Sequence, residues 1–402
     1  MQTTDGDDAP GGLVTAARTA VGAIGVEDGA AAAIAELAGA LVRADTRNPP
    51  GGELRAARLV HERLRAAGIA AELLPFGDGR ANLVARIRGR GERPALLFSG
   101  HLDTVPVADA ERWTVPPLGG LVHDGRVHGR GALDMKGAVA AMVVTMERLH
   151  RLGRTPAGDL VLALTAGEET DSVGATMLCD AGLLDDVGEA VIGEPTGLDV
   201  GIAHRGALWV SAAMEGTAAH GSQPHAGVNA VCALLDWLTP FSTIAELIGG
   251  SDPILGRGSV SLNSINGGQA PNVIPDAAQA TLDFRTVPGH SHPQILAALR
   301  ARLEGVRLTV LRDSPPISTP RESPLVEAAI AAVGEVVGEH RVRGLPYMTD
   351  GSIFVDRLGA SAVVVGPGAE ADAHTADESV AVADLARAAR IYGAIAARLI
   401  FP

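Results

Sequence analysis

Short apolar runs alternate with segments of helical periodicity through the first half of the chain. Apolar residues recur every three to four positions in 31–46 and 53–67, which predicts two amphipathic helices. Four apolar runs of strand length and two further helical segments follow. The predicted strands are 81–87, 94–100, 160–166 and 189–193, and the predicted helices are 134–152 and 172–181. This alternation indicates an α/β domain with a mostly parallel sheet flanked by helices.

The pattern becomes richer in strands after residue 205 and returns to helix–strand alternation after residue 320. The strand-rich part has predicted strands at 205–216, 258–265, 277–287 and 306–311, and predicted helices at 229–238 and 293–304. The later part has predicted helices at 325–337 and 380–399 around a strand at 361–366. We therefore expect an α/β domain made of 29–205 and 316–402, interrupted by a smaller α+β domain over 206–315. Residues 1–28 are expected to form a tail or an N-terminal arm.

Composition narrows the classes of function. The chain has 402 residues, 47% of them hydrophobic, and a formal charge of −14. A net negative charge argues against nucleic acid as a partner, because phosphate binding needs clustered Lys and Arg. The sequence shows neither a signal peptide nor an apolar stretch of membrane-spanning length, so we expect no membrane partner. Cys179 and Cys232 lie far apart and are expected to be small core residues, which fits a reducing, cytoplasmic location.

Titratable residues follow the ends of three predicted strands. His101 and Asp103 follow 94–100, two adjacent glutamates follow 160–166, and Glu194 follows 189–193. Ligands bind at the carboxyl ends of strands in α/β folds, so these side chains are expected in one pocket. Two further candidates are Asp134, at a predicted helix start, and His374, which lies near the C-terminus after the predicted strand 361–366.

Imidazoles and carboxylates that converge in one pocket suit zinc or a similar divalent ion. There are too many candidate ligands for one tetrahedral ion, but they suit two ions that share a bridging carboxylate. One of the adjacent glutamates, Glu168 or Glu169, is expected to bind metal and the other to act as a general base, and the sequence leaves open which. Taken singly, each residue could instead be a surface charge, a helix N-cap (Asp134) or a loop turn (Asp103). The candidate ligands are His101, Asp134, Glu169, Glu194 and His374.

Eight motifs, in order along residues 30–400, resemble one known family. They are SGHLDTVP, GRGALDMKG, AGEET, GEPT, AAHGSQPHAGVNA, APNVIPD, TDGSIF and AHTADE. The family is that of the dizinc amidohydrolases, which includes acetylornithine deacetylase, succinyl-diaminopimelate desuccinylase, aminoacylase and the glutamate-releasing carboxypeptidase. The chain departs from the biosynthetic deacylases at Asp377, where they typically have Asn, and this weakens a narrow assignment to arginine or lysine biosynthesis.

The resemblance implies a role for each candidate in the first domain. His101 and Glu194 resemble the ligands of one zinc ion, and Glu169 and His374 those of the second. Asp134 corresponds to the residue that bridges both ions. Asp103 would then hold His101 by its other ring nitrogen, and Glu168 would be the general base and acid. The implied cofactors are two divalent ions, Zn2+ first, with Co2+ or Mn2+ as alternatives.

The resemblance also implies roles for the interrupting domain, which forms the dimer interface in the family. His220 would reach the partner subunit's active site and stabilise the oxyanion, with His225 as a second candidate. Arg285 and Asn272 would bind the substrate carboxylate, although Arg285 could instead form a surface salt bridge. Further contacts are expected from the turn that follows residue 348, namely from Thr349, Gly351 and Ser352. The implied assembly is a homodimer.

The expected function is therefore metal-dependent hydrolysis of the amide bond of an N-acyl amino acid that carries a free carboxylate. A dipeptidase or carboxypeptidase acting on a short peptide is the alternative within the hydrolases. A non-catalytic binding protein should have lost a ligand or the base, and none is missing. A nucleotide-dependent transferase would need a phosphate-binding loop, and GRGAL lacks that pattern. Trp113 is expected to line the pocket or to pack, and the remaining histidines are expected on the surface or on helix faces.

Overall fold

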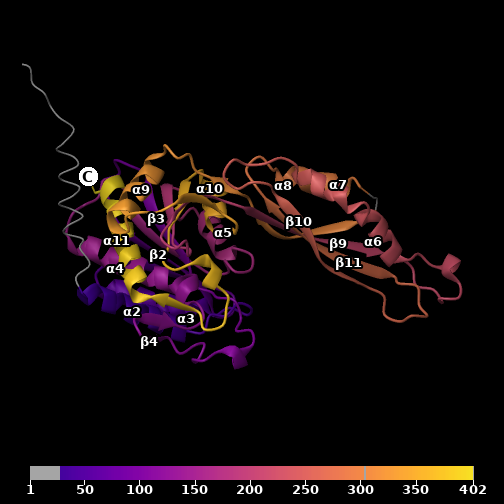
Figure 1. Cartoon of the computed structure of the whole chain (residues 1–402), viewed down its shortest axis with the longest axis horizontal. Helices are drawn as coiled ribbons and strands as arrows, with labels where there is room; N and C mark the ends of the chain where they lie inside the picture. The colour runs from indigo at the N-terminus through magenta and orange to yellow at the C-terminus, as the bar shows by residue number, and fades with distance from the viewer. Residues whose placement is uncertain (1–27, 303–304, 402) are drawn as a thin grey trace, which may run out of the picture. The chain divides into compact units, whose positions relative to one another are not determined.

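The computed structural model describes residues 28–302 and 305–401. They form two compact units (Figure 1). The first unit comprises the described residues of Met1–Gly201, Thr319–Val342 and Arg357–Pro402, and the second comprises those of Ile202–Ser318 and Arg343–Asp356. The predicted tail lies outside the described residues except for Asp28, which begins the first helix.

The first unit is built on a mixed sheet in the order β1-β2-β6-β3-β7-β15, followed by β8, of which only Val200 and Gly201 belong to this unit. Its centre is parallel, because β6, β3, β7 and β15 pair in parallel, whereas β1, β2 and β8 add antiparallel edges. All side chains of β3 and β6 are buried, which is typical of parallel strands covered on both faces. The strands are β1 (Ala70–Phe76), β2 (Arg80–Ile87), β3 (Ala95–His101), β6 (Leu160–Thr165), β7 (Val187–Ile192), β15 (Ser361–Val364) and β8 (Val200–His204).

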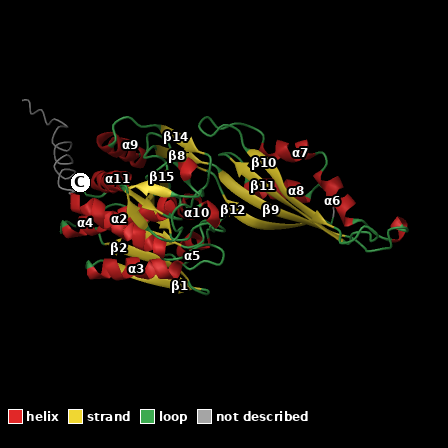
Figure 2. Ribbon diagram, turned by 60° about the horizontal axis from the view of Figure 1, so that its bottom comes forward, coloured by secondary structure: helices red, strands yellow, loops and turns green. Residues whose placement is uncertain are grey.

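Helices cover this sheet (Figure 2). The helix α4 lies against β3 and β6 and contacts α2 and α11, and α3 lies along β1 and β2. A small antiparallel sheet, β16-β5-β4, completes the unit. The helices are α2 (Asp28–Arg43), α3 (Glu53–Ala66), α4 (Gly137–Arg151), α5 (Val173–Asp180), α9 (Pro324–Val336) and α11 (Val382–Leu399). The small strands are β4 (Leu121–His123), β5 (Arg126–His128) and β16 (Ser379–Ala381).

The second unit contains a four-stranded antiparallel sheet in the order β10-β11-β9-β12. In β11, every second residue from Ala278 to Thr286 is buried, whereas β9 is buried at most positions on both of its faces. The helix α6 packs on β9 and β11, and Trp237 and Phe284 lie in the core between them. The strands are β9 (Gly206–Glu215), β10 (Ser259–Gly267), β11 (Ala277–Thr286) and β12 (Arg307–Ser314), and the helices are α6 (Ala230–Leu238), α7 (Phe241–Ala245) and α8 (His292–Arg300).

The second unit also takes in residues 343–356, which the sequence assigned to the catalytic domain. The reason is long-range pairing, since β14 (Val342–Leu345) pairs with β8, and β13 (Ile317–Ser318) pairs with the same strand at His204. This segment leads into α10 (Gly351–Leu358).

Two further findings bear on expectations from composition. Among the described residues, no single helix is long and apolar enough to cross a bilayer. One bent pair of helices, Ala230–Leu238 with Phe241–Ile248, meets the length and composition criteria when the two are taken together. That pair contributes Trp237 and Ile244 to the buried core of the second unit.

The two cysteines form no disulfide, and only Cys179 is buried. Cys232 is exposed because it lies off the buried face of α6.

Candidate metal centre

Three predicted ligand segments meet at one edge of the first unit's sheet. Strands β3 and β6 run parallel with His101 opposite Thr165, so His101 stands beside the turn that carries Glu168 and Glu169. On the other side of β3, β7 runs parallel with Ile192 opposite Ser99. Glu194 therefore leaves the sheet at the same edge.

Two glycines allow the segment that carries Asp134 to approach these strand ends. A Cβ atom on Gly100 would lie 2.8 Å from Cε of Met135, and one on Gly193 would lie 2.9 Å from the same atom. A larger residue at either position would force the Met135 side chain to move. Glycine directly before His101 and Glu194 thus lets the turn containing Asp134 pack against both strands.

Asp134 is not part of the helix that the sequence predicted to begin there. Its backbone angles are φ −119° and ψ 94°, it lies in the irregular turn η2 (Ala132–Lys136), and α4 begins at Gly137. The N-cap residue of α4 is Lys136, so the interpretation of Asp134 as a helix cap is wrong. The extended backbone turns its carboxylate toward two histidines instead.

The Asp134 carboxylate lies between His101 and His374. Its Oδ1 is 3.0 Å from Nε2 of His101, and its Oδ2 is 3.1 Å from Nε2 of His374. The same His374 nitrogen lies 3.2 Å from Oε1 of Glu169, and the His101 nitrogen lies 3.5 Å from Oε1 of Glu194. One carboxylate therefore joins two groups, each of which has a histidine and a glutamate.

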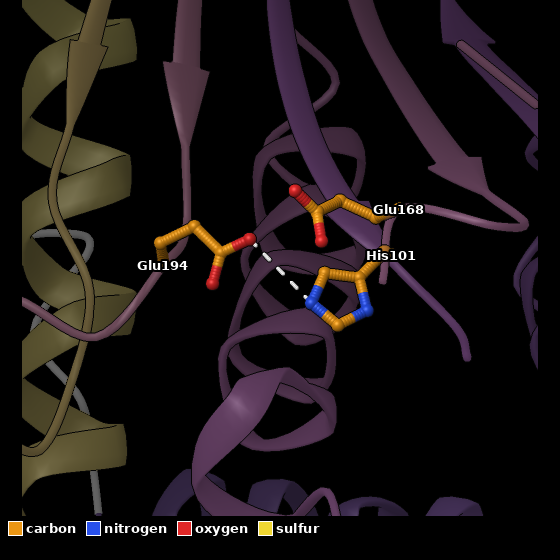
Figure 3. A group of neighbouring side chains, drawn as sticks. All are labelled: His101, Glu168 and Glu194. Atoms are coloured by element: carbon orange, nitrogen blue, oxygen red, sulfur yellow. Dashed lines mark ion pairs between the residues drawn. The ribbon is translucent and has the colours of Figure 1, made fainter. Parts of the chain in front are cut away.

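Donor atoms in this cluster are close enough to share ions. Ligand atoms of His101, Glu168 and Glu194 lie within 4.8 Å of one another, as do those of His101, Asp134 and Glu169. Figure 3 shows the carboxylates of Glu168 and Glu194 converging beside the His101 ring. Imidazole nitrogen and carboxylate oxygen are donors that zinc, cobalt and manganese accept, so the residues fit divalent ions.

Asp103 organises both the histidine and the two glutamates. The ring nitrogen Nδ1 of His101 donates to the main-chain carbonyl of Asp103 at 2.9 Å, and the Asp103 carboxylate lies 3.6 Å from that nitrogen. The carboxylate accepts hydrogen bonds from the backbone N–H groups of Glu168 (3.1 Å) and Glu169 (3.2 Å). It also accepts one from the side chain of Asn48 at 3.0 Å. The role of Asn48 was not predicted, because its local sequence, NPPGG, does not indicate a hydrogen bond with Asp103.

The electrostatics of the cluster favour protons on its histidines. Hydrogen bonds to Asp134 and Glu169 raise the pKa of His374 to about 10. Burial opposes a charged His101, but Glu194, Asp103 and Asp134 outweigh it and raise its pKa well above the usual range. Burial and the Asp134 charge raise the pKa values of Glu194 and Glu169. An ion that binds here must displace these protons, so its affinity depends on pH.

The second unit gathers some of its predicted residues and separates others. The segment with His220 pairs with the segment that precedes β11, because Gly221 donates to the carbonyl of Asn272 at 2.7 Å. His225 follows in the turn η3 (Pro224–Ala226) and is exposed, as is His220. Arg285 is not with them: from Ala277 to Arg285, β11 rises about 27 Å at 3.4 Å per residue.

Arg285 is engaged on its own sheet. Its Nε lies 3.0 Å from Oδ1 of Asp283, and its guanidinium lies 5.9 Å from the ring centroid of Trp209. Arg312 lies over the same ring, at 5.4 Å. The salt bridge uses only the Nε edge of Arg285, so it is compatible with carboxylate recognition by the outer fork.

In the turn after residue 348, the hydroxyl groups of Thr349 and Ser352 form hydrogen bonds within the protein. Oγ1 of Thr349 lies 3.1 Å from Nε2 of His204 and accepts a hydrogen bond from the N–H of Gly351. Ser352 donates its hydroxyl proton to the carbonyl of Pro315 at 2.7 Å. His204, expected on the surface, is fully buried, and burial lowers its pKa to about 4. The hydroxyl groups of Thr349 and Ser352 are therefore engaged within the second unit.

Comparison with known sequences decides the family. Residues 97–398 match the family described as Peptidase family M20/M25/M40. The chain belongs to this family. It is 33% identical to a protein of Staphylococcus epidermidis named probable succinyl-diaminopimelate desuccinylase, over 85% of this chain and 91% of the relative. It is also 33% identical to a succinyl-diaminopimelate desuccinylase of Alkalilimnicola ehrlichii, over 91% of this chain and 98% of the relative.

Solved structures show the same fold at low sequence identity. An M20 family metallo-carboxypeptidase from Sulfolobus solfataricus superposes with a TM-score of 0.75 at 18% identity, over 92% of this chain and 99% of that one. A dinuclear metal-binding M20 peptidase from Bacillus subtilis gives 0.69 at 15% identity, over 92% and 98%. These findings confirm the predicted fold class and family resemblance, and they confirm a metal-dependent hydrolase of amide bonds.

Proposed function

We propose that this M20 family member hydrolyses the amide bond of an N-acyl amino acid, using two divalent ions, Zn2+ first and Co2+ or Mn2+ as alternatives. The observation that carries this proposal is the Asp134 carboxylate, with one oxygen 3.0 Å from His101 and the other 3.1 Å from His374. A carboxylate with a histidine on each side suits two ions that share a bridging ligand.

The distances favour a division of the ligands between two positions. His101 and Glu194 would hold one ion, and Glu169 and His374 the other, with Asp134 shared. When bound, such ions polarise the substrate carbonyl and lower the pKa of water.

Glu168 is proposed as the general base and acid. It is buried, its carboxylate groups with His101 and Glu194, and its backbone is fixed by the Asp103 carboxylate. A carboxylate in this place can take a proton from the attacking water and deliver it to the departing nitrogen. The neighbouring Glu169 faces His374 instead, which supports separate roles for the two adjacent glutamates.

His220 is proposed to stabilise the oxyanion in a partner subunit. Its Nδ1 accepts a hydrogen bond from the backbone N–H of Ser222 at 3.1 Å, so in the neutral ring the proton is on Nε2. An exposed Nε2–H is a donor suited to developing negative charge. Since β11 separates Asn272 from Arg285 within one chain, a small substrate that contacts both would need Asn272 and His220 from a second copy.

A homodimer is proposed because this site needs residues from a second copy, and because one strand of the second unit has an exposed apolar edge. The strand β10 is an edge strand of the second unit's sheet, and it exposes Leu262 and Ile265. Exposed apolar side chains on an edge strand favour pairing with another chain. A cytoplasmic location is proposed from the two free cysteines.

The substrate is proposed to carry a free carboxylate, which Arg285 would bind through its outer fork, with Asn272 of the partner beside it. The desuccinylase names of the relatives favour a deacylase. A dipeptidase or carboxypeptidase is the second candidate, because a di-peptidase from Saccharomyces cerevisiae shares the fold, with a TM-score of 0.73 at 14% identity.

A panel assay tests this proposal. The purified protein would be given N-acetyl, N-succinyl and N-formyl amino acids and unmodified dipeptides, as isolated, after chelation, and after zinc, cobalt or manganese is restored. We expect hydrolysis of at least one N-acyl amino acid, lost on chelation and regained with metal. Cleavage of dipeptides alone would favour the second candidate, and activity that survives complete metal removal would contradict the proposal.

A further inference from the structure

His374 differs from the other candidate ligands in how the chain holds it. Its side chain is 50% exposed, whereas those of His101, Glu194 and Asp134 are 1%, 7% and 12% exposed. It lies on a loop, with its own backbone in the left-handed region at φ 62°. Neither burial nor a strand fixes this ligand, so its position depends on contacts made by the rest of its loop.

A buried ion pair supplies those contacts. Glu378 follows His374 on the same loop, and its carboxylate pairs with the guanidinium of Arg130. Both side chains are buried, at 1% and 2% exposure. Arg130 also donates from Nη2 to the main-chain carbonyl of His374 at 3.3 Å, and its guanidinium lies 5.4 Å from the ring centroid of Trp113. Trp113, for which pocket lining and packing were both expected, therefore packs against this ion pair.

The same carboxylate reaches the bridging ligand. Oε1 of Glu378 accepts hydrogen bonds from the backbone N–H of Leu133 at 2.9 Å and from that of Asp134 at 3.2 Å. Glu378 thus connects the backbone of Asp134 to the loop that carries His374. Through Arg130, the connection extends to the His374 backbone itself.

The loop has further supports away from the cluster. Oδ1 of Asp377 accepts a hydrogen bond from the N–H of Thr114 at 2.7 Å. A Cβ atom on Gly368 would lie 2.1 Å from Cδ1 of Leu133, so the loop packs tightly there. These contacts hold the loop on the unit, whereas the Glu378 carboxylate sets the separation of Asp134 and His374.

We infer that Glu378 and Arg130 are positioning residues for the His374 side of the metal centre. Loss of their ion pair, with the Glu378 oxygen still accepting from the Asp134 backbone, weakens one of two metal-binding steps and leaves the step at His101 and Glu194 unchanged. This inference rests on the proposed two-ion function. Outer partners of metal ligands typically contribute 10–100-fold in metal affinity, and we expect a loss in that range for the weaker step.

The test compares metal binding by matched variants of the full chain. Glu378→Gln keeps the shape but places an amide against the Arg130 guanidinium, which breaks the charge pair. Arg130→Lys keeps the charge, but one ammonium cannot replace the planar fork that serves both Glu378 and His374. The matched control is Glu147→Gln, because Glu147 is also buried and paired with an arginine, Arg63, at 2.7 Å. It lies near the C-terminal end of α4, about 15 Å along the helix axis from Gly137, where α4 begins.

Calorimetric titration with Co2+, together with the visible absorption of bound Co2+, reads each step without any activity assay. We expect two steps in the unmodified chain and in Glu147→Gln, and one unchanged step with the other weakened about 10–100-fold in Glu378→Gln. Arg130→Lys should show a smaller loss at the same step, and it serves as the test if Glu378→Gln does not fold.

Two other results would have distinct meanings. Two unchanged steps in folded Glu378→Gln or Arg130→Lys, with only a loss of thermal stability like that of the control, would overturn the positioning role. Fewer than two steps in the unmodified chain would overturn the two-ion proposal itself, and the positioning role with it.

Discussion

The two sides of the metal centre are held by different means. On one side, His101 ends one buried parallel strand and Glu194 follows another, and burial fixes their side chains. On the other side, His374 is half exposed on a loop, and Glu169 faces it from the end of β6. The half of the site at His101 and Glu194, here called the rigid half, is therefore positioned by strands that the local sequence specifies. The half at His374, here called the loop half, depends on an ion pair between Arg130 and Glu378, which lie far apart in sequence.

The largest expected effect separates the two adjacent glutamates. Glu168→Gln should lower kcat about 10²–10⁴-fold, because the general base is lost while every proposed ligand remains. Glu169→Gln should instead weaken metal binding on the His374 side. Steady-state kinetics with metal titration would distinguish them. Full activity in Glu168→Gln would show that the base lies elsewhere.

The next effect contrasts the two histidines in the metal-free chain. His101→Ala leaves buried carboxylates without their partner and should lower the free energy of unfolding by about 3–5 kcal/mol. His374→Ala removes a half-exposed group and should cost no more than about 1 kcal/mol. Urea unfolding after chelation measures both. Equal losses would contradict the proposed difference between the two sides.

Changes in pH should alter the metal-free chain in one direction. The pKa of His374 is raised to about 10 from 6.5, so its stabilising charge is fully present below about pH 6.5 and is lost as pH rises through 10. The pKa values of Glu169 and Glu194 are also raised in the folded chain, so these groups ionise more readily in the unfolded chain. Their ionisation therefore also lowers the stability of the folded chain as pH rises. Metal-free stability should therefore fall between pH 6.5 and 10. Stabilisation by added Co2+, read as the shift in Tm, should be larger at pH 8.5 than at pH 6.5, and a shift independent of pH would contradict this account.

The smallest effect concerns Asp377, the departure from the deacylase pattern. Its side-chain oxygen accepts from the N–H of Thr114, and an asparagine carbonyl can accept the same bond. Its φ of 57° also suits asparagine. Asp377→Asn should change stability by no more than about 0.5 kcal/mol. A large change in substrate preference on this substitution would show that Asp377 acts on the substrate.

Much of the rigid half could be predicted from the sequence. The strands ending at His101, Thr165 and Ile192 are apolar runs of strand length, and parallel strands place their carboxyl ends at one edge. The strand β1 escaped prediction because AAELLPF contains Pro75 and mixes charge with apolar residues. The small sheet escaped because three-residue strands such as Leu121–His123 carry no periodicity.

The loop half could not be predicted in the same way. Glu378 is the last residue of the AHTADE motif, but the sequence around it does not indicate a hydrogen bond with the backbone of Asp134. Asn48 and Arg130 have the same limitation, since their partners lie far along the chain. The backbone N–H of Asp134 donates to Glu378, a long-range contact that helical periodicity does not indicate.

We propose that His101 with Glu194 would hold one ion and Glu169 with His374 the other, and that Asp134 would be shared between them. Calorimetric titration of the chelated protein with Co2+, compared with Asp134→Ala, tests it most directly. The account predicts two ions per chain in the unmodified protein and weakening of both binding steps by this single substitution. Two unweakened steps in folded Asp134→Ala, or a failure of the unmodified protein to bind any ion, would contradict it.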